Sequence, residues 1–167
     1  MNEGSVALFG IEAGLLKGLD TLRWTLECVQ KFAEIRAIST VVQSTSRREV
    51  PCLRVVVKTS VEHGPEQLIA ELKKIEIEYE EQLKVMESLR CFLLAYNNLV
   101  AVTPRMTLPH PQMVDSSSWL YCSWEVWRSY RHPVLELTLE RLLAQAPVTN
   151  VEFFSQGKSV ITKTPVI

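Results

Sequence analysis

The sequence predicts an α/β fold of the α+β kind, in which four strands alternate with two helices. Four apolar runs, rich in β-branched or aromatic residues, are typical of strands and lie at 5–10, 34–45, 52–60 and 88–98. Leucines and other apolar residues recur every three or four positions over 14–32, which indicates an amphipathic helix. A second, longer helix is predicted over 63–89, because Pro65 suits the first helical turn.

The order of these elements is β-α-β-β-α-β, which is the ferredoxin-like order, and it spans residues 5–98. In such a fold both helices cover one face of the sheet, so we expect the other face to be left available for a site. Residues 99–167 are predicted to be an appended region of the same single domain, 1–167. We expect helices at 119–129 and 133–146, and then either two short strands about a turn at Gln156 and Gly157 or one strand followed by a frayed tail.

Composition restricts the classes of function. The chain has 167 residues and a formal net charge of -1, so it has no basic field for nucleic acid. No apolar stretch approaches the roughly 20 residues of a membrane span, and the N-terminus does not resemble a signal peptide. Four scattered cysteines favour a reducing, cytoplasmic location. The three histidines lack the i, i+4 spacing of a helical metal site, so we predict no metal ligands.

No general catalytic motif is present, neither a phosphate-binding loop nor a nucleophile elbow nor a zinc-binding H-E-x-x-H. Clustered acids at 76–81 on the second helix are typical of a solvated face, with a paired-carboxylate site as the alternative. Three tryptophans, Trp119, Trp124 and Trp127, are more typical of a core or a covering lid than of a base-stacking platform. These residues do not by themselves indicate an activity.

Two phrases in the appended region carry a family resemblance. Residues 103–113 are TPRMTLPHPQM and residues 132–143 are HPVLELTLERLL. They resemble the phrases T-x-R-L-T-L-P-H-P-x-M and H-P-V-L-x-x-T-L-x-x-L-L of the hydroxymethyl-dihydropterin pyrophosphokinase (HPPK) family of folate biosynthesis. The resemblance extends to Val148 and implies a ferredoxin-like core. It also implies transfer of diphosphate from ATP to a pterin, with Mg²⁺ and ATP required if that activity persists.

The metal ligands of the family are replaced in this chain. Family members carry D-L-D-L-L-L-Y-G in the central strand, and the two aspartates hold magnesium. The resemblance places these aspartates at Arg90 and Phe92. Arg90 about 5 Å from Mg²⁺ would repel it by roughly 6 kcal/mol at an effective dielectric of about 20. We therefore predict that no residue here is catalytic in the family's manner.

The phosphate-binding cations are also largely replaced. The family has a flexible Gly-Arg loop before the central strand, whereas this chain has Glu80 and Glu81 followed by helix-forming residues. A further family arginine falls on Ser116. Arg105 and His110 persist, so the resemblance makes these two residues candidates for nucleotide binding.

The pterin contacts differ as well. The resemblance places the stacking aromatic and the neighbouring asparagine of the third strand at Cys52 and Arg54. A second stacking aromatic falls on Ser118, although Trp119 is adjacent and could take its place. The glutamate of the second helix is kept as Glu76. The remaining pterin residues, in the first turn, are replaced by Ile11 and Glu12.

These replacements lead to the hypothesis of a catalytically degenerate homologue, a pseudoenzyme that acts as a binding or interaction protein. An exposed apolar cluster of Phe92, Trp119 and Trp124 would favour an unknown protein partner. One alternative is an active pyrophosphokinase whose metal ligands have moved to other carboxylates, namely Glu76, Glu78 or Asp115. Another is a sensor that binds ATP through Arg105 and His110, and a pterin remains a possible ligand by resemblance.

Overall fold

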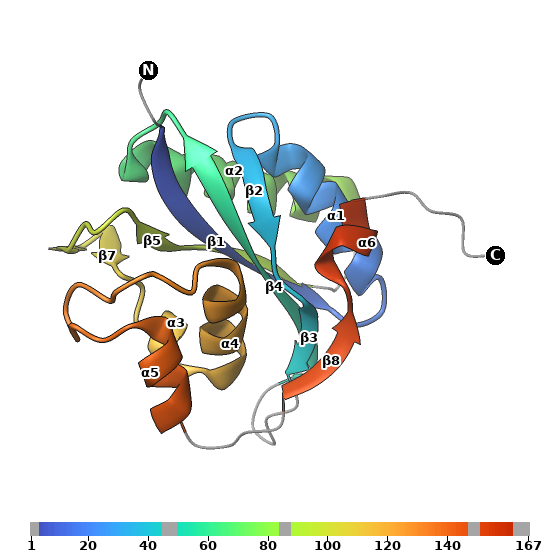
Figure 1. The fold of residues 1–167 in the computed structure, drawn as a ribbon. Helices are drawn as coiled ribbons and strands as arrows, with labels where there is room; N and C mark the ends of the chain where they lie inside the picture. The colour runs from blue at the N-terminus through green and yellow to red at the C-terminus, as the bar shows by residue number, and fades with distance from the viewer. Residues whose placement is uncertain (1–3, 45–49, 84–87, 147–150, 162–167) are drawn as a thin grey trace.

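The computed structural model describes residues 4–44, 50–83, 88–146 and 151–161. Its strands are β1 (Ser5–Gly14), β2 (Glu34–Ile38), β3 (Val41–Ser44), β4 (Cys52–Val61), β5 (Leu89–Tyr96), β6 (Ala101–Thr103), β7 (Met106–Leu108) and β8 (Val151–Ser155). Its helices are α1 (Gly18–Val29), α2 (Pro65–Leu83), α3 (Gln112–Asp115), α4 (Ser117–Val126), α5 (Leu139–Gln145) and α6 (Gly157–Ile161). The predicted α/β fold class is confirmed (Figure 1).

The main sheet is antiparallel and follows the predicted ferredoxin-like order. It runs β5-β1-β4-β3-β8, with β2 also paired to β4, and β6 and β7 form a separate hairpin. Successive residues of a strand point to opposite faces, so Phe9 and Ile11 face one way and Leu8 the other. Phe9 and Ile11 join the core beneath α1 and α2, where Leu22 and Leu68 are fully buried.

The second face of the sheet is not left open, which corrects the expectation from the sequence. Helices α3, α4 and α5 lie over it, on the side away from α1 and α2 (Figure 1). Leu8, Val56 and Leu94 on this face pack in a second core with Trp119 of α4. These strand residues are apolar, so leaving them in water would cost roughly 25 cal/mol per Å² of exposed area. The sheet is therefore buried on both faces.

The predicted strand 34–45 is divided into β2 and β3 at Ser39 and Thr40. The Ser39 N–H donates to the Val56 carbonyl at 2.9 Å, and the Ser39 hydroxyl accepts from the Val56 N–H at 2.9 Å. The Thr40 N–H and hydroxyl both donate to the Glu125 carboxylate of α4, at 2.6 and 2.8 Å. These bonds replace strand pairing at the break and join the sheet to α4.

Three predicted elements differ from the structure. The first helix begins at Gly18 rather than residue 14, because β1 continues to Gly14. The predicted helix 133–146 forms only from Leu139, where Thr138 caps it by accepting a hydrogen bond from the Arg141 N–H. The tail forms one strand, β8, which pairs with β3, and then the short helix α6 in place of a second strand.

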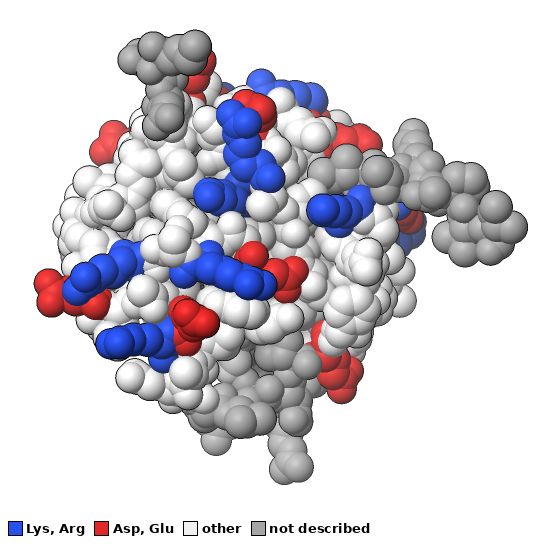
Figure 2. Space-filling view, viewed as in Figure 1, with Lys and Arg blue, Asp and Glu red and all other residues white. Residues whose placement is uncertain are grey.

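The described residues form no helix with both the length and the apolar character that a bilayer span needs. On the face that carries α4 and α5, basic and acidic side chains are interspersed (Figure 2). This mixture agrees with the formal net charge of -1.

Candidate functional site

Three charged residues lie in one row across three adjacent strands of the sheet. Glu12 of β1 is the register partner of Arg54 in β4 and of Arg90 in β5. Residues opposite one another on antiparallel strands point to the same face, which here is the face covered by α4. The row lies where β1 ends and where β4 and β5 begin.

Arg54 is buried and is surrounded by polar partners. Its Nε donates to Glu12 Oε2 at 2.7 Å, and both side chains are almost fully buried. Its Nη1 donates to the hydroxyls of Ser118 at 2.7 Å and Ser116 at 3.1 Å. The guanidinium also lies 5.1 Å from the centre of the Trp119 ring. A buried ion pair needs such additional hydrogen bonds to offset its desolvation, and this pair has them.

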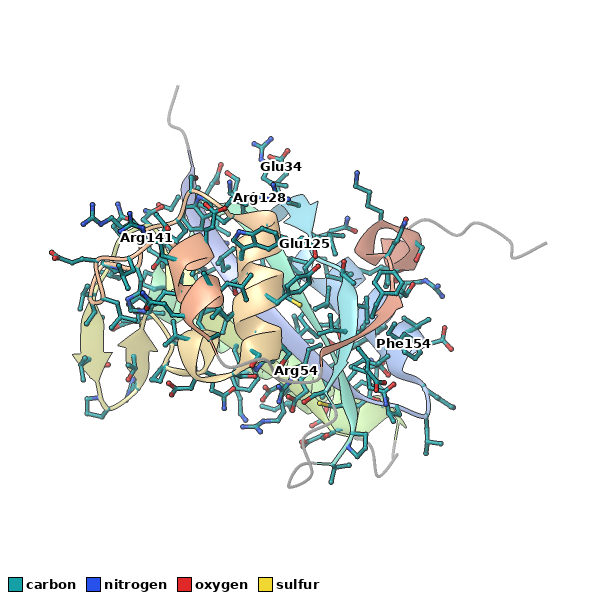
Figure 3. The ribbon with its side chains drawn as sticks, turned by 60° about the horizontal axis from the view of Figure 1, so that its bottom comes forward. Glu34, Arg54, Glu125, Arg128, Arg141 and Phe154 are labelled. Atoms are coloured by element: carbon teal, nitrogen blue, oxygen red, sulfur yellow. The ribbon has the colours of Figure 1, made fainter. Side chains whose placement is uncertain are left out.

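Figure 3 shows Arg54 at the end of α4 opposite to Arg128. This is the end at which α4 begins, because Ser116 and Ser118 supply the hydroxyls. The Arg54 network therefore fixes the start of α4 on the sheet, just as Glu125 fixes its far end to Thr40.

Phe92, the second aligned metal position, lies in an aromatic cluster. Its ring is edge-on to His110 at 5.4 Å and to Trp119 at 5.7 Å between ring centres. The Arg90 guanidinium lies over the Phe92 ring at 5.1 Å from its centre. Such contacts add roughly 0.5 to 1.5 kcal/mol each beyond area burial. The second aligned metal position therefore holds the packed phenyl ring of Phe92 beside the positively charged guanidinium of Arg90.

His110 is held in the neutral form. Burial lowers its pKa, and the positive charge of Arg90 lowers that pKa further. Its Nδ1 accepts a hydrogen bond from the Gln112 N–H at 3.2 Å, so this nitrogen carries no proton. Its backbone N–H donates to the Leu94 carbonyl of β5 at 2.8 Å, which fixes the segment on the sheet.

Two cavities of similar size lie beside β5, one lined by Arg90 and the other by Phe92. One, of about 410 Å³, is lined by residues that include Glu12, Cys52, Arg54, Arg90 and Gln112. The other, of about 430 Å³, is lined by residues that include Cys91, Phe92, Arg105 and His110. Both volumes fall in the range of small-molecule sites. We call them the arginine cavity and the hairpin cavity, since the second also contains residues of the β6–β7 hairpin.

The predicted nucleotide candidates, Arg105 and His110, thus line the same hairpin cavity. Of the predicted pterin positions, Cys52 and Arg54 line the arginine cavity. Ser118 and Trp119 are buried beneath it, in contact with Arg54. The structure therefore brings four of the five pterin positions together.

Glu76, the fifth pterin position, lies elsewhere. It is on α2, and its Oε1 accepts a hydrogen bond from the Cys91 N–H at 2.8 Å. Since β5 is an edge strand, Glu76 satisfies a backbone donor that would otherwise be unpaired. Its other oxygen lies 3.2 Å from Lys73 Nζ.

Phe92, Trp119 and Trp124 do not form the exposed apolar cluster that would favour a protein partner. Trp119 is fully buried, and Phe92 and Trp124 are half-buried in the core under α4. The reason is again the apolar second face of the sheet, where Phe92 of β5 packs against Trp119 of the covering helix α4. Helix α2 extends to Leu83 as expected for the replaced loop, while residues 84–87 lie outside the described part of the chain.

Within the described ranges, no group of three or more histidine, cysteine or acidic side chains is placed to hold a metal ion. The sequence identified Glu12 and Ser116 only as replaced family positions and missed their bonds to Arg54. One signal was available: Glu12 interrupts an otherwise apolar strand, as Arg54 does, and two opposite charges in buried strands are expected to pair.

Comparison with known proteins gives a likeness at the level of structure. No family model matches the sequence, and no curated protein matches it. The HPPK-DHPS of Plasmodium falciparum, solved with pterin and p-hydroxybenzoate, matches with a TM-score of 0.68 and 12% identity over 87% of this chain. A single-substitution variant of that protein, solved with SDX-DHP, gives a TM-score of 0.70 at 11% identity over 87% of this chain.

A triple mutant of the same protein gives a TM-score of 0.72 at 11% identity, over 87% of this chain. The chain spans under half the length of these neighbours, between 43% and 46%. An identity this low establishes the fold and not the activity. The chain therefore has an HPPK-like fold.

Proposed function

We propose that this protein is a catalytically degenerate relative of the pterin pyrophosphokinases, which binds a ligand and does not transfer diphosphate. The observation that carries the proposal is the packing of Phe92 between His110 and Trp119, with Arg90 over its ring. Phe92 and Arg90 stand where the resemblance places the two magnesium ligands. The HPPK-like fold supports the same comparison.

These residues do not fit Mg²⁺. Magnesium in proteins is bound by oxygen ligands, usually carboxylates together with phosphates and water. A phenyl ring supplies no oxygen, and a guanidinium supplies a positive charge that repels the ion. No step of a magnesium-dependent transfer is therefore derived for this site.

A carboxylate recruited from elsewhere is the first alternative. Glu76 already accepts the Cys91 N–H at 2.8 Å, and Glu78 accepts from the Gln82 side chain at 3.0 Å. Asp115 lies in α3. To serve as a metal ligand, Glu76 would have to share its carboxylate with this edge-strand donor or release it, and release costs about 1–3 kcal/mol. An active enzyme with relocated metal ligands is therefore less favoured than the proposed loss of transfer.

Nucleotide binding without transfer is the second alternative, and one observation favours it. Arg105 and His110 line a single cavity of about 430 Å³, and Arg105 is exposed there. A guanidinium can bind a phosphate group in a two-point contact. Under this alternative the protein would be an ATP sensor, with affinity for nucleotide that does not depend on a pterin.

The test is an assay for AMP release from ATP and Mg²⁺ with hydroxymethyl-dihydropterin as acceptor, with an active pyrophosphokinase as the positive control. We expect no AMP above the rate without protein, because the site lacks carboxylates at both metal positions. Magnesium-dependent AMP formation that requires the pterin would refute the proposal. Calorimetric titration with a non-hydrolysable ATP analogue then separates the sensor, which binds it, from a protein that does not.

A further inference from the structure

We propose that the arginine cavity binds a small organic molecule that carries a single carboxylate. This inference rests on the proposed function, since it assigns a ligand class to the same degenerate site. Among the described residues, the charged side chains that line the cavity are those of Glu12, Arg54 and Arg90. These described side chains, two cations and one anion, sum to one positive charge in a space of about 410 Å³.

The two arginines differ in their partners. Arg54 is buried and its charge is offset by Glu12, whose Oε2 lies 2.7 Å from Arg54 Nε. Arg90 is exposed, and no carboxylate of the described residues forms an ion pair with it. Its guanidinium lies over the face of the Phe92 ring, 5.1 Å from the ring centre, and a contact of this kind leaves the edge of the guanidinium available. Arg90 is therefore the residue that can bind an anion.

The ring contact also prepares Arg90 for binding. A guanidinium held flat against an aromatic ring loses less conformational freedom when it binds, and its planar donors match a carboxylate in two parallel hydrogen bonds. Phe92 is itself held by His110 and Trp119, so the platform is fixed. The neutral state of His110 means that it adds no second positive charge beside Arg90.

The charge balance selects a monoanion. One uncompensated guanidinium matches one carboxylate, whereas a phosphate dianion would leave a negative charge in the cavity that Glu12 also lines. The cavity volume falls at the lower end of the range for small-molecule sites, which fits a compact ligand. Pro51 and Cys52 contribute apolar surface for its body.

The experiment uses benzoate as the probe, benzamide as its neutral counterpart, and inorganic phosphate as the competing anion. Binding is followed at low ionic strength from the NMR signals of the arginine Nε–H groups, because salt screens such contacts. We expect benzoate to shift the Arg90 signal and benzamide to leave it unchanged. Phosphate should bind more weakly than benzoate.

Arg90→Gln should weaken benzoate binding about ten-fold or more, since a hydrogen bond to a charged group is lost. Arg90→Lys should keep part of the affinity, and Arg141→Gln, on the exposed face of α5, should keep all of it. Equal benzoate binding by Arg90→Gln, tighter binding of phosphate, or no benzoate binding by the unaltered protein would overturn the inference. The AMP-release assay is run on the same sample, because it tests the proposed function separately from benzoate binding. AMP formation would refute the proposed function, whatever the benzoate titration shows.

Discussion

At the scale of single residues, the buried pair of Glu12 and Arg54 determines much of the site. The pair costs desolvation energy, which the ion contact and the hydroxyls of Ser116 and Ser118 offset. It also occupies the sheet face beneath the arginine cavity with charges that satisfy each other. This arrangement leaves Arg90, and not Arg54, as the residue that can interact with a ligand.

Removing one member of the pair should be costly. We expect Glu12→Gln to lower the free energy of unfolding by about 3 kcal/mol, because the buried Arg54 would lose the carboxylate that lies 2.7 Å from its Nε. Urea denaturation followed by circular dichroism measures this. The double variant Glu12→Leu with Arg54→Met should be closer to the unaltered protein, since it removes both charges. A loss below about 1 kcal/mol in the single variant would show that water reaches Arg54.

At the scale of elements, the C-terminal segment 151–161 completes the sheet. Strand β8 pairs with β3, and α6 places Val160 in the core beneath α1, where Arg23 Nε donates to the Val160 carbonyl at 2.8 Å. Gly157 joins the two elements. A Cβ atom at Gly157 would lie 2.0 Å from the Ser39 carbonyl oxygen, so only glycine fits against this part of the chain.

Gly157→Ala should therefore displace α6 from the sheet. We expect a loss of about 1–3 kcal/mol in the free energy of unfolding, together with faster amide exchange in α6 and β3. Hydrogen exchange measured by mass spectrometry resolves these elements from the rest. Gly64→Ala is the matched control, because a Cβ there meets no atom within 4 Å. Exchange that rises equally throughout the chain would mean that the segment does not move as a local unit.

The elements that the sequence predicted well are those with a strong local pattern. The apolar stripe of α1 indicates a helix, and the β-branched run of β4 indicates a strand. The division between β2 and β3 was missed because its cause is Glu125, 85 residues from Thr40 in sequence. The start of α5 at Leu139 was also missed, although Thr138 has the chemistry of a helix cap.

At the scale of the whole molecule, the sequence predicted which residues gather but not how they interact. The resemblance placed Cys52, Arg54, Ser118 and Trp119 in one region, and the structure brings these four together. The prediction that Trp119 belongs to a core is confirmed, but its packing on Phe92 could not be predicted, because that contact depends on how α4 lies on the sheet. The second apolar face of the sheet explains both the position of α4 and the burial of the aromatic residues.

The stability of the whole domain should depend on pH through two histidines, the half-buried His110 and the buried His132. Burial lowers the pKa of His110 and of His132, and each accepts a backbone N–H at Nδ1, from Gln112 and from Leu135 respectively. Below a pH of about 6.5 the unfolded chain takes up protons that the folded chain resists. The free energy of unfolding should therefore fall as the pH falls from about 6.5 to the lowered pKa values.

Each histidine can contribute at most about 1.4 kcal/mol per pH unit in that interval. Denaturant titrations at several pH values between about 5 and 7.5 measure how the free energy of unfolding changes with pH. This range lies above the pH at which most carboxylates titrate. His110→Asn should reduce the slope, because asparagine has no proton to gain and its amide can still accept the Gln112 N–H. An unchanged slope in this variant would assign the effect to His132 and imply that His110 takes up its proton in the folded protein at the same pH as in the unfolded chain. Protonated His110 would set a second positive charge beside Arg90, and the arginine cavity would then favour a dianion over the single carboxylate inferred above.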